Sequence, residues 1–119
     1  MPTLSLRQRY AQRVLDLYRW TPETSGIARR TDRRLAAALY DRRIPLEMVY
    51  AALLLAAVRR AFRPSDAPTL APIATLHYFL PVIDELLATP LDAGYIHYLR
   101  RALALRAPAL VAAFNHQIP

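Results

Sequence analysis

The sequence predicts an all-α protein, one compact bundle of five or six helices around a central apolar helix at about residues 45–63. Three observations predict this fold class. The stretch 44–63 is apolar on nearly every side of a helical wheel, so other helices must enclose it. The chain has only 2 Gly, which argues against a turn-rich β architecture, and its 10 Pro separate segments of helical periodicity. With 119 residues, a single domain spanning 1–119 can form a core without disulfide or metal support.

A first helix is expected from about Ser5 to Trp20, because apolar residues recur there at helical spacing. Its buried stripe is predicted to contain Leu6, Tyr10, Val14, Leu17 and Tyr18. Aromatic residues among arginines can also form a base-stacking platform. We favour burial, because the tyrosines follow the spacing of the core. The segment 21–28 contains Pro22 and Gly26 and is expected to be a loop.

A second helix is expected from near Thr31, a plausible N-cap followed by Asp32, to about Arg43. Its apolar face is predicted to contain Leu35, Ala36, Ala38 and Leu39. The central helix follows after a short junction. Pro45 suits its first helical position, because the missing N–H has no intrahelical partner there. The end of the central helix is expected to be basic and its middle to be core.

Two helices joined by a short basic turn also resemble the helix-turn-helix of DNA-binding proteins. We do not favour this interpretation, because the usual turn glycine is absent. The second helix would also lack the Arg, Asn or Gln side chains that contact base edges. Its first turns present Leu46, Glu47, Met48 and Tyr50 instead.

Prolines dominate the connection between the two halves of the chain. Residues 63–74 contain three of them and are expected to be extended, with Leu70 and Ile73 holding the segment to the domain. The next helix is expected at about 75–88, with Pro81 inside it. Proline removes a helical hydrogen bond, so we expect either a kink or a short turn followed by a helix that begins at Pro81.

A fifth helix is expected after Thr89 as cap, Pro90 at the first position and Asp92 in the first turn. Its buried stripe is predicted to contain Tyr95, Tyr98, Leu99, Ala102 and Leu103. A short last helix should run from Pro108 through Phe114, with the remaining residues frayed.

Several classes of function have no support in the sequence. The absence of Cys excludes disulfides and thiolate sites and makes a reducing cytoplasm the simplest compartment. No apolar signal segment opens the chain, and the run Met48–Val58 is far shorter than the ~20 residues that span a bilayer, so we expect no membrane partner. The histidines lack metal-site spacing, and there is no phosphate loop or nucleophile elbow. We therefore expect no metal, no cofactor, no catalytic residue and no enzyme.

The positive charge lies mainly in the N-terminal half. All 16 basic residues are arginine. Residues 1–64 contain 13 arginines and five acidic residues, a net charge of +8, whereas residues 65–92 carry −4 and residues 93–119 carry +3. Codon usage in a GC-rich genome would explain the choice of arginine over lysine. The alternative is a surface selected for contact with phosphate or carboxylate, and of the two explanations we favour codon usage. Asp84 and Glu85 are adjacent and point in different directions, so we expect a solvated acidic edge that pairs with arginines elsewhere, not a catalytic pair.

The charge distribution predicts a non-enzymatic module that binds nucleic acid, DNA or RNA, mainly through phosphate contacts. The arginines expected to make these contacts are Arg29, Arg30, Arg33, Arg34, Arg42, Arg43, Arg59, Arg60 and Arg63. The alternative is a protein-interaction or assembly subunit that forms homo-oligomers or hetero-oligomers, with arginines that meet acidic partners or solvent. Convergence of the nine arginines on one face would favour nucleic acid, and scatter would favour the alternative.

The middle half of the chain also carries a resemblance. It lies in the strings DRRLAAALYDRRIPLEMVYAALLLAAVRR at 32–60 and TLHYFLPVIDEL at 75–86, with the proline-rich spacer between them. The pattern resembles bacterial proteins of replication and mobile-element regions and is similar to the helical DnaD-like domain of replication initiators. The resemblance implies a DNA-associated, oligomer-forming helical protein. The chain lacks the winged-helix domain of that family and a basic stretch after the aromatic helix.

Overall fold

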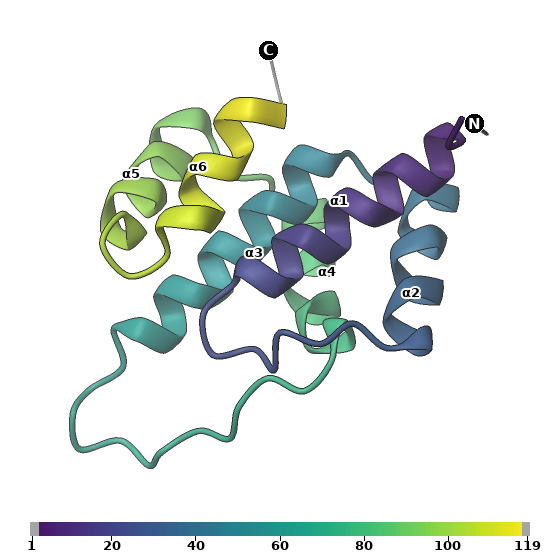
Figure 1. Cartoon of the computed structure of the whole chain (residues 1–119). Helices are drawn as coiled ribbons and strands as arrows, with labels where there is room; N and C mark the ends of the chain where they lie inside the picture. Colours follow the sequence, from purple (N-terminus) through teal and green to yellow (C-terminus); the bar gives the residue numbers. More distant parts are fainter. Residues whose placement is uncertain (1–2, 118–119) are drawn as a thin grey trace.

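The computed structural model describes residues 3–117, with side chains described for residues 3–113. Within that range the chain forms six α-helices and one short 3-10 helix, and its only β pairing is an isolated bridge between Thr24 and Ile73. The elements are α1 (Leu6–Trp20), α2 (Arg30–Asp41), α3 (Leu46–Ala61), η1 (Leu76–Phe79), α4 (Leu80–Ala88), α5 (Ala93–Leu103) and α6 (Pro108–Gln117). The predicted all-α bundle is confirmed (Figure 1).

The central position of α3 is also confirmed. It crosses the middle of the bundle and packs against α1, α4, α5 and η1 (Figure 1). All residues from 49 to 57 are buried. Pro45 is the N-cap of α3 and not its first helical residue, so the helix begins one residue later than expected, at Leu46. Because residues 49–57 of α3 are buried, the middle of this helix cannot lie in a DNA groove. No helix in the described range 3–117 is long and apolar enough to cross a membrane.

Helices α1 and α2 form an antiparallel pair. Ser5 and Gln8 form a capping box at the start of α1, and Arg7 pairs with Asp41 at the end of α2 at 2.8 Å. The predicted stripe of α1 is buried at Val14, Leu17 and Tyr18 and half-buried at Tyr10. Leu6 is exposed, contrary to expectation, because it lies in the first turn of α1 at the outer end of the bundle. The tyrosines of this helix therefore belong to the core and not to a stacking platform.

The start of α2 differs from the prediction. Thr31 lies inside the helix and Arg29 takes the cap position, although its side chain makes no capping bond. The buried carboxylate of Asp32 caps the helix instead, accepting the backbone N–H of Arg29 at 2.9 Å. The same carboxylate accepts the backbone N–H of Leu76 at 3.0 Å. Asp32 thus joins the start of α2 to the start of η1.

The end of α2 places a non-glycine residue in the left-handed region. Arg43 donates its backbone N–H to the carbonyl of Tyr40 at 2.8 Å, and Ile44 donates to that of Leu39 at 3.1 Å. These bonds form a Schellman motif, in which glycine usually occupies the position held by Arg43. The φ angle of Arg43 is 59°, which costs about 1–2 kcal/mol for a residue with a Cβ atom. The turn between α2 and α3 therefore forms without a glycine, although the absence of a turn glycine was one of the arguments against a helix-turn-helix.

The proline-rich segment between α3 and η1 forms no helix, but it is not extended throughout as expected, because the backbone N–H of Ala67 donates to the carbonyl of Pro64 at 3.0 Å and closes a turn. The backbone of Ile73 pairs with the 21–28 loop through bonds to Glu23 at 2.8 Å and Ser25 at 3.0 Å, and its side chain is buried. Leu70 is exposed and does not hold the segment to the core as expected. After this segment, the 3-10 turn η1 precedes a helix with Pro81 in its first turn. The second of the two alternatives for Pro81 is therefore the one observed.

Helix α5 begins later than predicted, with Asp92 and not Thr89 as its N-cap. Leu99 and Leu103 are buried as expected, but Tyr95 and Tyr98 are 42% and 51% exposed. The two tyrosine rings stack on each other at 5.7 Å between centroids, so each covers part of its neighbour in solvent. Helix α6 begins at Pro108 and its backbone continues to residue 117, beyond the predicted end at Phe114, whose side chain lies outside the described ones.

Candidate nucleic-acid interface

The nine predicted arginines lie at three separate places. Four are at the start of α2, two are at the junction of α2 and α3, and three are at the end of α3. The two ends of α2 are about 18 Å apart, since a helix rises 1.5 Å per residue. The nine arginines therefore do not converge on one face. By the criterion stated above, this scatter favours the assembly alternative for the nine as a set, and each group has to be considered on its own.

Two of the nine arginines pair with the acidic edge of α4. Arg59 donates two hydrogen bonds to Glu85, at 3.0 and 2.6 Å, and Arg42 contacts Asp84 at 3.4 Å. The hydrogen bonds from Arg59 lower the pKa of the Glu85 carboxyl. The predicted pairing of these adjacent acids with distant arginines is confirmed. Because both pairs are exposed, each contributes little to stability.

Arg60 is enclosed, which contradicts the expectation that the whole basic end of α3 faces solvent. Its side chain is only 5% exposed and contacts Glu23 at 3.1 Å. It also donates to the carbonyl of Ala71 at 2.8 Å and to the hydroxyl of Tyr78 at 3.1 Å. A buried arginine needs such partners, because an unpaired charge is costly inside a protein. Arg60 therefore joins α3, the 21–28 loop and the proline-rich segment.

The start of α2 carries the densest group of exposed positive charge. We call this group, Arg29, Arg30, Arg33 and Arg34, the α2 arginine cluster. All four residues are exposed, and none pairs with a carboxylate in the described part of the chain. The one acid in this turn, Asp32, faces the core and is fully buried. The inward position of Asp32 leaves the outer face of the turn with arginines alone.

The arrangement of the α2 arginine cluster opposes helix stability. Arg29 and Arg33 are four residues apart, as are Arg30 and Arg34, and like charges at this spacing repel by about 0.2–0.5 kcal/mol per pair. Arg29 and Arg30 also lie at the positive end of the helix macrodipole, which disfavours cations by about 0.3–1 kcal/mol each. A bound anion would relieve both effects. The positions of these four arginines therefore destabilise the start of α2 when no anion is bound and favour the binding of an anion.

The cluster continues onto α1 along a shallow pocket. Arg33 and Arg19 both line this pocket, which has a volume of about 340 Å³. Arg19 is held by Asp16 on its own helix, at 2.8 Å. Gln8 and Gln12 supply further polar groups along the same side of α1. The antiparallel packing of α1 and α2 thus extends the polar surface beyond the first turns of α2.

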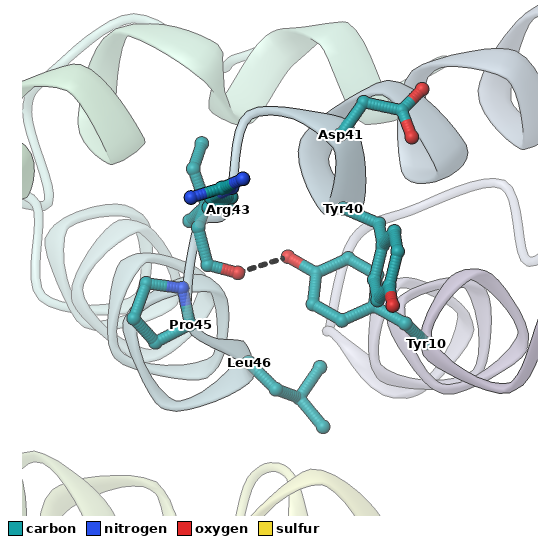
Figure 2. Close-up of a pocket in the computed structure, with 7 residues that line it drawn as sticks. Tyr10, Tyr40, Asp41, Arg43, Pro45 and Leu46 are labelled. Atoms are coloured by element: carbon teal, nitrogen blue, oxygen red, sulfur yellow. Dashed lines mark hydrogen bonds between the residues drawn. The ribbon is translucent and has the colours of Figure 1, made fainter. Parts of the chain in front are cut away.

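At the opposite end of α2, Arg43 borders a larger pocket of about 620 Å³ (Figure 2). The guanidinium lies on one side of the pocket and the rings of Tyr10 and Tyr40 lie on the other. These rings meet edge to face at 5.4 Å, and the hydroxyl of Tyr10 donates to the carbonyl of Ile44 at 2.7 Å. Arg43 is exposed and has no carboxylate partner among the described residues. It is a second cationic position that could contact an anion.

Burial predicts an unusual alkaline titration for three tyrosines. Burial, with a smaller effect of the Glu47 charge, raises the pKa of Tyr10 to about 12, and burial also raises the pKa of Tyr18 and Tyr50. The neutral phenol of Tyr10 therefore stabilises the fold below about pH 10, and this contribution is lost as the pH rises towards 12. We expect tyrosine absorbance to show a class that ionises only together with unfolding. Ionisation of all tyrosines in one step, without unfolding, would contradict this burial.

Sequence reasoning missed two structural features of the candidate interface, the burial of Asp32 and the left-handed backbone of Arg43. The buried role of Asp32 depends on Leu76, which is distant in sequence, so local patterns show only an acid in the first turn. The left-handed Arg43 gives no local signal, because glycine is the residue that marks such a turn.

In the described part of the chain, no group of three or more His, Asp or Glu side chains is placed to hold a metal ion. No protein-family model, no curated protein and no solved structure matches the chain.

Proposed function

We propose that the protein binds nucleic acid, DNA or RNA, through phosphate contacts of the α2 arginine cluster, without catalysing a reaction. The observation that carries the proposal is a group of four exposed arginines that repel each other and have no acidic partner among the described residues. One guanidinium group can donate two parallel hydrogen bonds to two oxygen atoms of the same phosphate. Each of these arginine side chains can therefore contact the phosphate backbone of a nucleic-acid strand. Arg43, also exposed and without a carboxylate partner, is a further contact in this proposal.

Several features favour a polymer over a single small anion at this surface. The α2 arginine cluster spans about one and a half helical turns and continues along the pocket that Arg33 shares with Arg19, so its cations are spread and not focused on one point. A nucleic acid offers a row of phosphates that matches such a spread. The resemblance to replication and mobile-element proteins suggests the setting, and we include that association in the proposal.

The double variant R33Q/R34Q tests the proposal. Each phosphate contact contributes about 0.9 to the slope of log affinity against log salt concentration for duplex DNA and about 0.7 for single strands. Loss of two contacts should therefore reduce that slope by about 1.8 for duplex DNA or about 1.4 for a single strand. Fluorescence anisotropy with labelled oligonucleotides at several salt concentrations measures the change.

The matched control is R101Q/R106Q, which removes the same charge from exposed positions in the C-terminal part of the chain. We expect this variant to bind with nearly the slope of the unmodified protein. If both double variants lose the same affinity and slope, binding reflects net charge alone, and the α2 arginine cluster is not the interface.

The assembly function is a second candidate, favoured by the exposed tyrosine pair on α5. Tyr95 and Tyr98 form a stacked aromatic surface, and aromatic residues are enriched at protein interfaces. Analytical ultracentrifugation across protein concentrations separates the two candidates. A concentration-dependent oligomer without salt-dependent affinity for nucleic acid would favour assembly. A monomer with such affinity would favour the proposed binding function.

A further inference from the structure

A second arginine-lined pocket lies at the end of α3, apart from the α2 arginine cluster. It has a volume of about 400 Å³, within the range of small-molecule sites. Its lining residues are Ala56, Arg59, Arg60, Arg63, Leu70, Tyr78, Pro81 and Val82. Three of the nine predicted arginines thus meet at one concave site, which was not apparent from their sequence positions.

The charged residues that line this pocket are all arginines, and no acidic residue is among the lining residues. Arg59 is held by Glu85 and Arg60 by Glu23, and neither carboxylate is among the lining residues. Arg63 donates one hydrogen bond to the carbonyl of Pro68 at 2.8 Å and has no carboxylate partner in the described range. A guanidinium has five N–H donors, so most of those of Arg63 remain for a ligand.

The buried arginine adds a second, independent observation. Arg60 lines the pocket with a side chain that is only 5% exposed. Its Nε–H is buried and has no hydrogen-bond acceptor among the described residues, although its other nitrogen atoms are bonded. Buried polar groups without a partner are rare in folded proteins and call for a specific explanation. An anion close to this guanidinium would lower the cost of its burial.

The remaining lining residues are apolar. Leu70 and Tyr78 are 40% and 44% exposed although both are large, and Pro81 and Val82 complete the wall from α4. The ring of Tyr78 also lies over the guanidinium of Arg60, with 5.5 Å between the guanidinium carbon and the ring centroid. A ligand that covered Leu70 and Tyr78 would remove apolar surface from water.

We propose that this pocket binds a small organic anion whose phosphate or carboxylate group contacts Arg63 and Arg59. The apolar or aromatic part of the ligand packs against Leu70 and Tyr78. Arg60 positions the wall of the pocket and supplies positive charge from beneath it. The site does not depend on nucleic-acid binding, because none of its residues belongs to the α2 arginine cluster.

Titrations of the full chain with four simple probes test this site. Phenyl phosphate and benzoate combine an anionic group with a ring, inorganic phosphate has only the charge, and phenol has only the ring. We expect phenyl phosphate or benzoate to bind saturably with one molecule per chain, at least about tenfold tighter than phenol and inorganic phosphate. NMR spectra of the backbone and of the arginine Nε–H groups report the binding, and the Arg60 Nε–H signal should shift.

Substitutions of the half-buried Arg63 and of the exposed Leu70 test the contacts of the anionic group and of the ring separately, without disturbing the core. R63Q should weaken phenyl phosphate by about tenfold or more and leave phenol unchanged, since it removes a charge-assisted contact. L70S should weaken both ring-containing probes and leave inorganic phosphate unchanged. R101Q, at an exposed position on α5, is the control and should change none of them.

Three results would overturn the proposal. They are equal affinity for phenyl phosphate and phenol, equal affinity for phenyl phosphate and inorganic phosphate, and equal weakening by R63Q and R101Q. Absence of saturable binding of every probe up to millimolar concentration would also overturn it. Once binding is found, comparison of an oligonucleotide with and without a 5′-phosphate distinguishes a nucleic-acid end from a free small molecule as the source of the anion.

Discussion

Leu53→Ala is expected to lower the free energy of unfolding by about 2–5 kcal/mol, the largest effect of any single change considered for this protein. Leu53 is fully buried in the middle of α3. Truncation removes apolar contacts and leaves a cavity that α1, α4 and α5 cannot fill without moving, because all three pack against α3. Urea denaturation followed by circular dichroism measures the loss.

Leu105→Ala provides the matched control for this change. The side chain of Leu105 is 98% exposed, so its truncation should change the free energy of unfolding by less than about 0.5 kcal/mol. Similar losses for the two variants would show that α3 is not enclosed by its neighbours, and the fold described above would then be incorrect in its main feature.

Asp32→Ala is expected to destabilise the fold by about 2–4 kcal/mol, because it leaves one buried and one partly buried backbone N–H group without an acceptor. These groups belong to Arg29 and Leu76, so the start of α2 would also lose its connection to η1. Asp32→Asn keeps one acceptor oxygen and should cost less. Thermal and urea unfolding give both values.

The control for Asp32 is Asp66→Ala, which removes the same charge from an exposed position in the proline-rich segment. That variant should be within about 0.5 kcal/mol of the unmodified protein. A loss below about 1 kcal/mol for Asp32→Ala would show that its two hydrogen bonds do not hold α2 in place. The outward position of the α2 arginine cluster would then need another explanation.

Sequence patterns were sufficient for the parts of the fold that depend on local chemistry. The apolar run of α3 predicted its enclosure, and Pro81 predicted a break between two helical segments. Asp84 and Glu85 were predicted to form a solvated acidic edge because adjacent residues on a helix point in different directions, and their distant partners are Arg42 and Arg59. In each case the residue type restricted the backbone or its surroundings strongly.

Long-range contacts account for what the sequence did not show. Arg60 follows Arg59 directly, yet one is buried and the other exposed, because only Arg60 faces Glu23 and Ala71. Helical spacing also misled the prediction for Tyr95 and Tyr98, because it suggested a core position although the two rings stack in solvent. The nine arginines looked equivalent in the sequence. In the structure Arg42 and Arg59 pair with α4, Arg60 is buried, four form the exposed α2 arginine cluster, and Arg43 and Arg63 each line a pocket.

The most direct test of the central claim is the affinity of the unmodified protein for a short labelled oligonucleotide at low and at physiological salt. If the four arginines of the α2 arginine cluster contact phosphates, we expect binding at low salt and a slope of log affinity against log salt of about −3.6 for duplex DNA or about −2.8 for a single strand. Absence of binding at low salt to single-stranded and double-stranded DNA and RNA would contradict the claim that these exposed charges form a nucleic-acid interface.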